Sequence, residues 1–375
     1  MEILEFAGQQ RKASQSTRRI KSERLDADRL ASAKPSFATR RVNLQDAHSL
    51  IRGQISPQAG DLVLARVEQL GQHTGLQRPD GRRAKIFPGD EIIVAFGARY
   101  APNQFESELP GDLEPCHLVA AGGMASRVIS KHRSIKRATQ IAPLGLLVNK
   151  DQQVLNLGTY AMPKSHFTQS CAVPVIAVAG TAMDAGKTTA AGDLIRGLNH
   201  AGFKVGAAKV TGTGACGDYF FFKDAGADYV VDFTDFGYGS TFGIGESELN
   251  RLFCDMVLHL QDRKLDVIVL EIADGLLQPE TAALLASDRY MQLVDSMIFC
   301  APDALGAVGG VEWLEHLGLH VSAVAGALTA APLAMKEAAG VVRLPVLSRA
   351  ELADPDVATR LLTRLDIRGQ AGLGS

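Results

Sequence analysis

The sequence predicts an α/β protein in which a mostly parallel sheet flanked by helices follows a smaller N-terminal all-β domain, a barrel or a sandwich. From residue 174 onward, apolar runs of strand length alternate with helix-like segments, and such runs indicate strands buried on both faces. Before that point, short β-branched runs are separated by closely spaced turns, which is typical of antiparallel strands. A chain of 375 residues is also too long for one ordinary core, so we expect two domains.

Composition limits the classes of function. The content of hydrophobic residues is 46% and that of charged residues 21%, as in soluble globular proteins. A net charge of -2 argues against a protein that binds nucleic acid over its whole surface. No apolar run reaches the roughly 18 residues of a membrane span, and the N-terminus lacks a signal pattern, so we expect a cytoplasmic protein without a membrane partner. The five cysteines are widely spaced, which disfavours disulfides and zinc ribbons.

The N-terminal half divides into two predicted parts. Residues 1–58 are expected to form a basic, partly helical arm. Acidic residues interrupt its basic run, so packing on a partner subunit is favoured over binding to nucleic acid. Residues 59–165 are expected to form the small antiparallel β domain, with turns at Asp80-Gly81 and at Pro88-Gly89-Asp90. Residues 172–375 then form the α/β domain.

The α/β domain contains six apolar runs that we predict as strands. They read VIAVAG, KVGAAKVTG, LDVIVLEIADG, SMIFCAP, HVSAVAGAL and VVRLPVL. Between the second and third runs, apolar residues recur at helical spacing and predict one amphipathic helix. Its apolar face is expected to consist of Leu249, Leu252, Phe253, Met256, Val257 and Leu260.

A glycine-containing turn, GTAMDAGKTT, joins the first of these strands to a helix-like pattern. A helix that starts at Lys187 directs several backbone N–H groups and a partial positive charge toward one point, which suits a phosphate. Lys187 would reach the β- and γ-phosphates, and the Thr188 hydroxyl would bind Mg²⁺. An ordinary turn with an exposed lysine is the alternative. The residues expected to bind the nucleotide are Thr181, Met183, Asp184, Ala185, Gly186, Lys187, Thr188 and Thr189.

The spacing of this turn departs by one residue from G-x-x-x-x-G-K-[ST], because Thr181 stands where the first glycine would be. A loop with this threonine resembles those of dethiobiotin synthetase and of the related amidating synthases of cobalamin biosynthesis. The partitioning and nitrogenase-iron ATPases of the same P-loop NTPase class carry an additional lysine where this chain has Ala182. The resemblance covers about residues 174–350. It implies ATP and Mg²⁺ as cofactors and a homodimer, because those synthetases build their sites across subunit contacts.

The stretch GFKVGAAKVTGTG is similar to the synthetase pattern G-Y-K-P-V-x-S-G, whose lysine contacts substrate and phosphate. The resemblance assigns this role to Lys209, with Thr211 and Thr213 in the same loop. A lysine at the carboxyl end of a parallel strand points into the ligand crevice of such a sheet. A solvent-facing lysine is the alternative.

The stretch DVIVLEIADG has the Walker B pattern, a buried strand that delivers a carboxylate to Mg²⁺. Glu271 is therefore a predicted metal ligand and catalytic residue, and Asp274 either assists it or serves the turn before Gly275. A further carboxylate is expected after the lysine strand. Asp218 is favoured for this position, and Asp224 and Asp228 are its competitors.

The glycine-rich and aromatic stretch DFTDFGYGSTFGIGESE is long enough to form a flap over the site. Ser240 and Thr241 would offer hydroxyls to a substrate carboxylate, and a plain surface connection is the alternative. No N-K-x-D motif follows the fourth strand, which favours ATP over GTP.

These patterns lead to three functional hypotheses. The first is an ATP- and Mg²⁺-dependent enzyme that activates a small carboxylate-bearing metabolite by phosphoryl transfer, an amide-forming ligase with Lys187, Lys209 and Glu271 as catalytic residues. The second is a small-molecule or polynucleotide kinase, although the D-x-G-Q sequence of the latter is missing. The third is a nucleotide-switched chaperone or ATPase that docks through the β domain. Its metal ligands would have to come from His166, Cys171 and Cys216.

Overall fold

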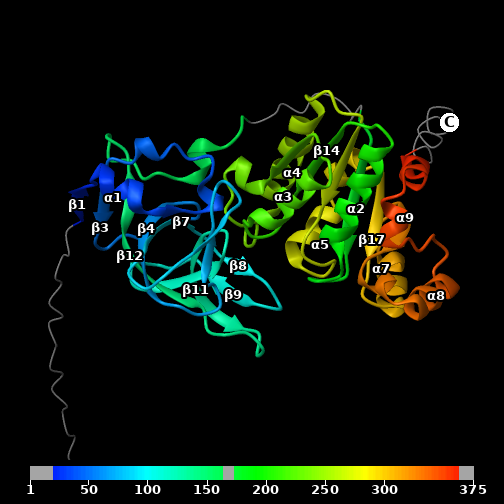
Figure 1. Ribbon diagram of the computed structural model, residues 1–375, viewed down its shortest axis with the longest axis horizontal. Helices are drawn as coiled ribbons and strands as arrows, with labels where there is room; N and C mark the ends of the chain where they lie inside the picture. The colour runs from blue at the N-terminus through cyan, green and yellow to red at the C-terminus, as the bar shows by residue number, and fades with distance from the viewer. Residues whose placement is uncertain (1–19, 164–172, 363–375) are drawn as a thin grey trace, which may run out of the picture.

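The computed structural model describes residues 20–163 and 173–362 of the chain. Figure 1 shows a β-rich half, built from the N-terminal residues, beside a half in which helices cover both faces of a second sheet. The predicted boundaries at residues 165 and 172 fall outside the described residues, as do His166 and Cys171. No helix in the described ranges is both long and apolar enough to cross a membrane.

The first sheet contains ten strands in the order β1-β3-β12-β4-β7-β11-β9-β8, with β10 pairing with β11 and β12, and β2 with β7. Because β10 pairs with both β11 and β12, the pairings β12-β4-β7-β11-β10 return to β12 and close a barrel. These five strands therefore have neighbours on both sides and leave no exposed sheet edge. The bounds are β1 Lys21–Arg24, β2 Lys34–Pro35, β3 Ser49–Arg52, β4 Leu62–Gln69, β7 Glu91–Phe96, β8 Arg99–Tyr100, β9 Phe105–Glu108, β10 Cys116–Ala120, β11 Met124–Lys131 and β12 Thr139–Val148. A separate hairpin consists of β5 (Gly75–Gln77) and β6 (Arg83–Lys85).

Alternating residues of β4 show how the barrel is filled. Val63, Ala65 and Val67 pack in one core with residues of β7, β10, β11 and β12. Leu62 and Leu64 belong to a second core on the opposite face of the strand. This alternation follows from the two-residue period of a strand, and over residues 62–65 both faces of β4 are buried.

The N-terminal segment differs from the predicted basic, partly helical arm. Its described part contributes β1 and β3 to the edge of the sheet, and its helix α1 (Ala27–Ser32) has only six residues. Leu25, Ala33 and Leu50 are buried against the second core of the barrel. Burial of these apolar side chains holds the segment on its own chain, a tertiary effect that the polar local sequence does not reveal.

The second sheet has the order β15-β14-β16-β13-β17-β18, and all of its pairings are parallel, as the sequence predicts. Its strands are β13 Val175–Gly180, β14 Val205–Lys209, β15 Tyr229–Asp232, β16 Val267–Glu271, β17 Ser296–Cys300 and β18 Val321–Ala325. The strand β15 was not among the six predicted strands. The prediction of a strand over residues 341–347 is wrong, because this segment forms only a single bridge, from Val346 to Val324. The carbonyl of Pro345 accepts a hydrogen bond from the N–H of Val324. Proline itself has no N–H to donate to a sheet.

Helices pack on both faces of this sheet (Figure 1). Side chains of α2 and α9 share one core, whereas those of α4, α5, α6, α7 and α8 share the other. The predicted apolar face of α4 is confirmed, because all six of its residues are buried. The bounds are α2 Lys187–His200, α3 Cys216–Asp224, α4 Glu246–Gln261, α5 Pro279–Leu285, α6 Asp288–Leu293, α7 Ala304–His316, α8 Pro332–Val341 and α9 Arg349–Leu352.

Candidate nucleotide-binding site

The turn from β13 to α2 lies at the centre of the parallel sheet, since β13 pairs with both β16 and β17. Gly186 caps α2 with φ +93°, and a Cβ at this position would lie 2.9 Å from the amide nitrogen of Ala327. Asp184 is a non-glycine residue with φ +66°. Left-handed residues of this kind curl the chain and direct its amides inward. The 181–186 turn therefore contains left-handed residues of the kind that phosphate-binding loops use.

The displaced glycine has a structural reason. A Cβ at Gly180 would lie 2.7 Å from the carbonyl oxygen of Cys300 and 3.0 Å from Cγ of Lys187, so glycine is required one step before the usual position. Thr181 instead donates its backbone N–H to the Cys300 carbonyl at 3.0 Å. Its hydroxyl is buried without a hydrogen-bond partner. The loop can therefore hold threonine at the position where the common motif has glycine.

Lys187 and Thr188 both face the tip of β16. Lys187 is only 6% exposed, and its ammonium donates to the carbonyl of Ala182 across the loop at 2.7 Å. Burial lowers the pKa of Lys187, and the charges of Glu271 and Asp274 oppose this shift. The Thr188 hydroxyl donates to Oε1 of Glu271 at 2.9 Å. The threonine and the strand-end acid predicted from sequence are thus in direct contact.

Glu271 is the most buried carboxylate of the site, at 1% exposure. Burial raises its pKa, and the ammonium of Lys209 opposes the shift. The second carboxylate oxygen, Oε2, is buried without a hydrogen-bond partner. A buried, unpaired carboxylate oxygen is costly, so this atom is suited to a ligand that the protein alone does not supply.

Lys209 ends β14 and pairs with the carboxylates of both Asp218 and Glu271. Burial favours the neutral amine, but these two carboxylates outweigh it and raise the pKa of Lys209 above its ordinary value. Of the three competing aspartates, the structure brings Asp218 to this lysine. Asp228 accepts from the N–H of Val205 at the other end of β14, and Asp224 is exposed at the end of α3.

The predicted substrate hydroxyls divide into two kinds. Thr211 and Thr241 are buried, and their hydroxyls bond the carbonyl of Ala273 and the N–H of Gly212. Thr211 thus ties its loop to the segment after β16, and Thr241 ties the flap to Gly212, so both hydroxyls serve contacts within the protein. Thr213 and Ser240 form a bridge between the same loop and the flap and remain partly exposed.

No residue of the β barrel was predicted from the sequence to bind a ligand, but the structure brings its 99–108 hairpin to this site. Asn103 donates to the carboxylate of Asp184 at 2.6 Å, and the ring of Tyr100 lies 5.5 Å from that of Phe242 in the flap. Burial lowers the pKa of Arg99 to about 10, and the charge of Asp274 opposes this shift. No local pattern marks these three residues, because their relevance depends on contacts between distant parts of the chain.

A cavity of about 380 Å³ lies beside the start of α2. It is lined by Gly186, Thr189 and Ala190, by four residues of the 326–330 loop, and by five residues between 347 and 352. The loop is anchored to the phosphate-binding turn, because the N–H of Ala327 donates to the carbonyl of Ala185 at 2.9 Å. This cavity therefore adjoins the 181–188 loop.

The central loop, the Lys-Thr pair at the helix start and the acid at the tip of the neighbouring parallel strand have the arrangement of a P-loop fold. No family model matches the chain, and no curated protein matches it. Among solved structures, the chain is similar to the signal recognition particle receptor FtsY from Elizabethkingia anophelis, with 17% identity, a TM-score of 0.34, and coverage of 49% of this chain and 59% of that one.

Two other solved structures show comparable similarity. The 54 kDa protein of the signal recognition particle from Aeropyrum pernix K1, in complex with GDP, is 18% identical with a TM-score of 0.34, covering 53% of this chain and 50% of that one. The kinase domain of the Escherichia coli tyrosine kinase ETK is 15% identical with a TM-score of 0.32, covering 40% and 66%. The chain thus matches less than two thirds of the length of each of these structures.

Proposed function

We propose that this chain is an ATP- and Mg²⁺-dependent enzyme that transfers the γ-phosphoryl group to a small carboxylate-bearing metabolite and then forms an amide. The observation that carries the proposal is the contact of Thr188 and Lys209 with one buried carboxylate, Glu271, beside the phosphate-binding loop. The Oε2 atom of Glu271, which has no hydrogen-bond partner, and the Thr188 hydroxyl are suited to bind a magnesium ion. Bound there, Mg²⁺ would neutralise charge on the phosphate oxygens.

Within the described ranges, no cluster of three His, Cys, Asp or Glu side chains is arranged to hold a metal ion. This agrees with a magnesium site of the nucleotide type, because Mg²⁺ usually takes one or two protein carboxylates and completes its shell with phosphates and water. The residues proposed to hold it are Thr188, Glu271 and Asp218, and Asp218 would have to part from Lys209 to do so. Lys187 and Lys209 are the cations proposed to bind phosphate oxygens.

The proposed reaction has two steps. An oxygen of the ionised substrate carboxylate bonds to the γ-phosphorus as the bond to the bridging oxygen breaks, which leaves ADP and an acyl phosphate. An amine then attacks the acyl carbon, loses a proton and expels phosphate. The resemblance of the loop to that of amide-forming synthetases supports this order, and it also supports a homodimer, which light scattering of the full chain tests.

The fate of the phosphoryl group distinguishes the proposal from its alternatives. With a panel of carboxylates and amines, we expect ADP and free phosphate to form only when both correct partners are present. A phosphorylated product that is stable without amine would instead identify a kinase. Slow hydrolysis that responds to a partner protein and to no small acid would identify a nucleotide-switched ATPase.

Replacing Glu271 with glutamine removes the charge and keeps the shape of the side chain. We expect ADP formation to fall by at least about 100-fold, since a metal ion supplies several kcal/mol of charge stabilisation and 1.36 kcal/mol is tenfold in rate. Nucleotide binding without Mg²⁺ should persist, whereas its enhancement by Mg²⁺ should be lost. Calorimetric titration with and without Mg²⁺ measures both, and unchanged enhancement would remove Glu271 from the metal site. Glu246→Gln, at the exposed start of α4, is the control.

The cavity beside α2 is proposed to bind the nucleobase. Among the described residues, the cavity lining includes hydroxyls, backbone and the side chain of Arg349 but no carboxylate, and this favours adenine, because the N–H groups of guanine are usually read by a carboxylate. We expect Ala330→Trp, at an exposed lining position, to weaken ATP binding by about tenfold or more through lost contact area. Inorganic tripolyphosphate, which needs only the loop, should bind equally well. Ala339→Trp, on the exposed part of α8, is the matched control.

A further inference from the structure

The hairpin formed by β8 and β9 (residues 99–108, the β8–β9 hairpin) contacts both the phosphate-binding loop and the flap. Asn103 at its turn donates to Asp184 of the loop at 2.6 Å, and the ring of Tyr100 lies 5.5 Å from that of Phe242 in the flap. Residues of this hairpin and residues 130–133, at the end of β11 and just after it, line a cavity of about 640 Å³. The same hairpin therefore forms a wall of this cavity and contacts the nucleotide site.

The segment 131–137, which reads KHRSIKR, carries four cations and no acid. Lys131 and Arg133 belong to the lining of the cavity, whereas Lys136 and Arg137 lie outside it. Within residues 20–163 and 173–362, none of these four side chains pairs with a carboxylate at 4.0 Å or less. The cavity therefore presents two cationic side chains that have no counter-ion in the described protein.

Glu106 is the one carboxylate among the described residues that line the cavity. Its Oε2 accepts from the Ser130 hydroxyl at 2.8 Å, across the paired strands β9 and β11. The basic segment is fixed beside the hairpin, because the N–H of His132 donates to the carbonyl of Gln104 at 2.8 Å. One carboxylate against two cations leaves a net positive charge, so the cavity is suited to an anion.

Gln104 adds a more specific requirement. Its side-chain oxygen, Oε1, is buried and has no hydrogen-bond partner, and the residue lines the cavity. A buried acceptor without a partner costs more than a typical hydrogen bond contributes, so an N–H or O–H group of a ligand would relieve it. The lining thus calls for a ligand that is anionic and also carries a hydrogen-bond donor.

The lining favours a small molecule over nucleic acid as this ligand. Grooves that bind single-stranded nucleic acid combine basic residues with aromatic side chains on which the bases stack. Tyr100 is the only Phe, Tyr or Trp among the described residues of the lining, and its ring already packs against Phe242. The cavity therefore offers charge and hydrogen bonding, but it lacks a free stacking platform.

We propose that this cavity binds the acid substrate of the proposed reaction, and that the substrate is a small dicarboxylate that also carries an N–H or O–H group. The inference rests on the proposed function, which requires one carboxylate to meet the γ-phosphoryl group at the loop. Lys131 and Arg133 then hold the second carboxylate, and Gln104 accepts from the donor. These contacts with the part of the substrate that does not react position the part that does, and they exchange no proton.

The test is calorimetric titration of the full chain, in the presence of ADP and Mg²⁺, with dicarboxylates in matched pairs. Malate and 2-hydroxyglutarate carry a hydroxyl that succinate and glutarate lack, at the same charge. For at least one chain length we expect the hydroxy acid to bind about threefold or more tightly than its partner, because its hydroxyl satisfies Gln104. Glutaramide, which has no charge, should not bind detectably.

Charge reversal at one exposed position tests the cations. We expect Arg133→Glu to weaken binding of the preferred hydroxy acid at least about tenfold, because it removes a charge-assisted hydrogen bond and adds a like charge. Lys136→Glu makes the same change of charge in the same exposed segment but outside the cavity, so its affinity should stay within about twofold. Both variants should bind ADP like the unchanged protein, since neither residue contacts the loop in the described structure.

Gln104→Leu tests the orphan acceptor with a readout that a general disturbance of the hairpin would not give. We expect this variant to lose the preference for the hydroxy acid while its affinity for the acid without the hydroxyl stays within about twofold. A preference that persists in Gln104→Leu would remove Gln104 from the site.

The outcomes separate this inference from the proposed function. If the unchanged protein binds ADP but none of the four dicarboxylates, or if Arg133→Glu and Lys136→Glu weaken their binding equally, the cavity is refuted while the nucleotide site stands. Failure to bind ADP would overturn the proposed function, and with it the role of the bound acid as substrate. Binding of a single-stranded RNA oligonucleotide that both variants reduce alike would identify segment 131–137 as a nucleic-acid surface and would also refute the proposal.

Discussion

Replacing Lys187 with alanine is expected to abolish ATP-dependent turnover and to weaken triphosphate binding by at least about 100-fold. Lys187 directly follows the loop, and its buried ammonium donates to the carbonyl of Ala182 within the loop. A bound triphosphate would take the place of that carbonyl as the partner of the ammonium. Folding has already removed this ammonium from water, so binding does not have to desolvate it again. The loss of this interaction is therefore larger than that of a surface ion pair.

The measurement is ATP titration by calorimetry, followed by ADP formation with the substrate panel. Lys204→Ala, an exposed lysine at the start of the next strand, is the matched control and should leave both unchanged. Lys187→Ala also loses a positive charge near Glu271 and Asp274, so its thermal unfolding is measured to confirm that the variant folds. Intact turnover in a folded Lys187→Ala protein would contradict the nucleotide-site assignment and with it every functional hypothesis above.

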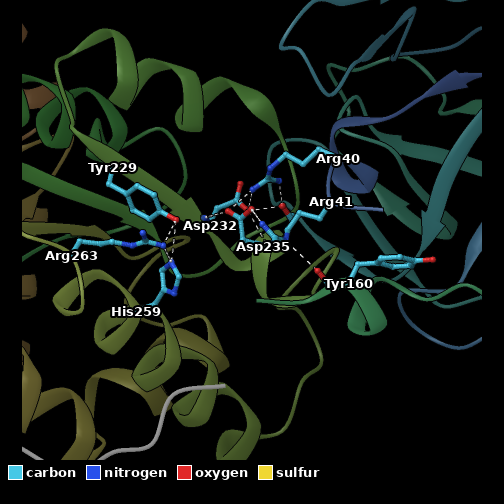
Figure 2. Close-up of polar contacts among 9 residues, drawn as sticks. Arg40, Arg41, Tyr160, Tyr229, Asp232, Asp235, His259 and Arg263 are labelled. Carbon is cyan, nitrogen blue, oxygen red and sulfur yellow. Dashed lines mark hydrogen bonds and ion pairs between the residues drawn. The ribbon is translucent and has the colours of Figure 1, made fainter. Parts of the chain in front are cut away.

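The second large effect concerns the contact between the barrel and the α/β half. Figure 2 shows Arg40 and Arg41 reaching toward Asp232 and Asp235. Arg40 is 10% exposed and pairs with Asp232 at 3.0 Å and with Asp235 at 2.5 Å. Its guanidinium also stacks over the ring of Phe37, 4.2 Å from the centroid. Both aspartates are nearly buried, and Arg40 is the cation that pairs with both of them, whereas Arg41 reaches only Asp235, at 3.8 Å.

We expect Arg40→Ala to lower the free energy of unfolding by about 3–5 kcal/mol, because it leaves two buried carboxylates without their cation. Arg41→Ala is the control from the adjacent position. Arg41 is 34% exposed and lies 3.8 Å from Asp235, so its loss should cost no more than about 1 kcal/mol. Chemical denaturation measures both variants, and equal losses would show that Arg40 has no special role.

The deficit of Arg40→Ala should also depend on pH. Burial and the charge of Asp232 raise the pKa of Asp235 to about 6, although Arg40 opposes the rise, so removal of Arg40 raises this pKa further. An acid with a raised pKa in the folded state stabilises the fold below its unfolded pKa and loses this stabilisation as the pH rises through the folded value. The difference between Arg40→Ala and the unchanged protein should therefore be larger at about pH 8 than at about pH 5. A difference independent of pH would exclude Asp235 as the titrating group.

Local sequence determined the parts of this protein in which neighbouring residues cooperate. The loop and start of α2 depend on consecutive residues, and so do the acid at the end of β16 and the amphipathic face of α4. Each of these features combines a short apolar run with a turn or a helical period. The interactions that determine it therefore lie within a stretch of about twenty residues. The parallel sheet follows from the same alternation of strands and helices.

Tertiary structure alone decided which distant residues meet. It brought Asp218, and not Asp224 or Asp228, to Lys209, and it placed Arg40 beside two carboxylates of the other half. It also drew the N-terminal segment into the barrel sheet and left residues 342–345 outside any strand. These outcomes depend on burial and on charges that approach one another only after folding, and a single sequence carries no local record of such long-range contacts.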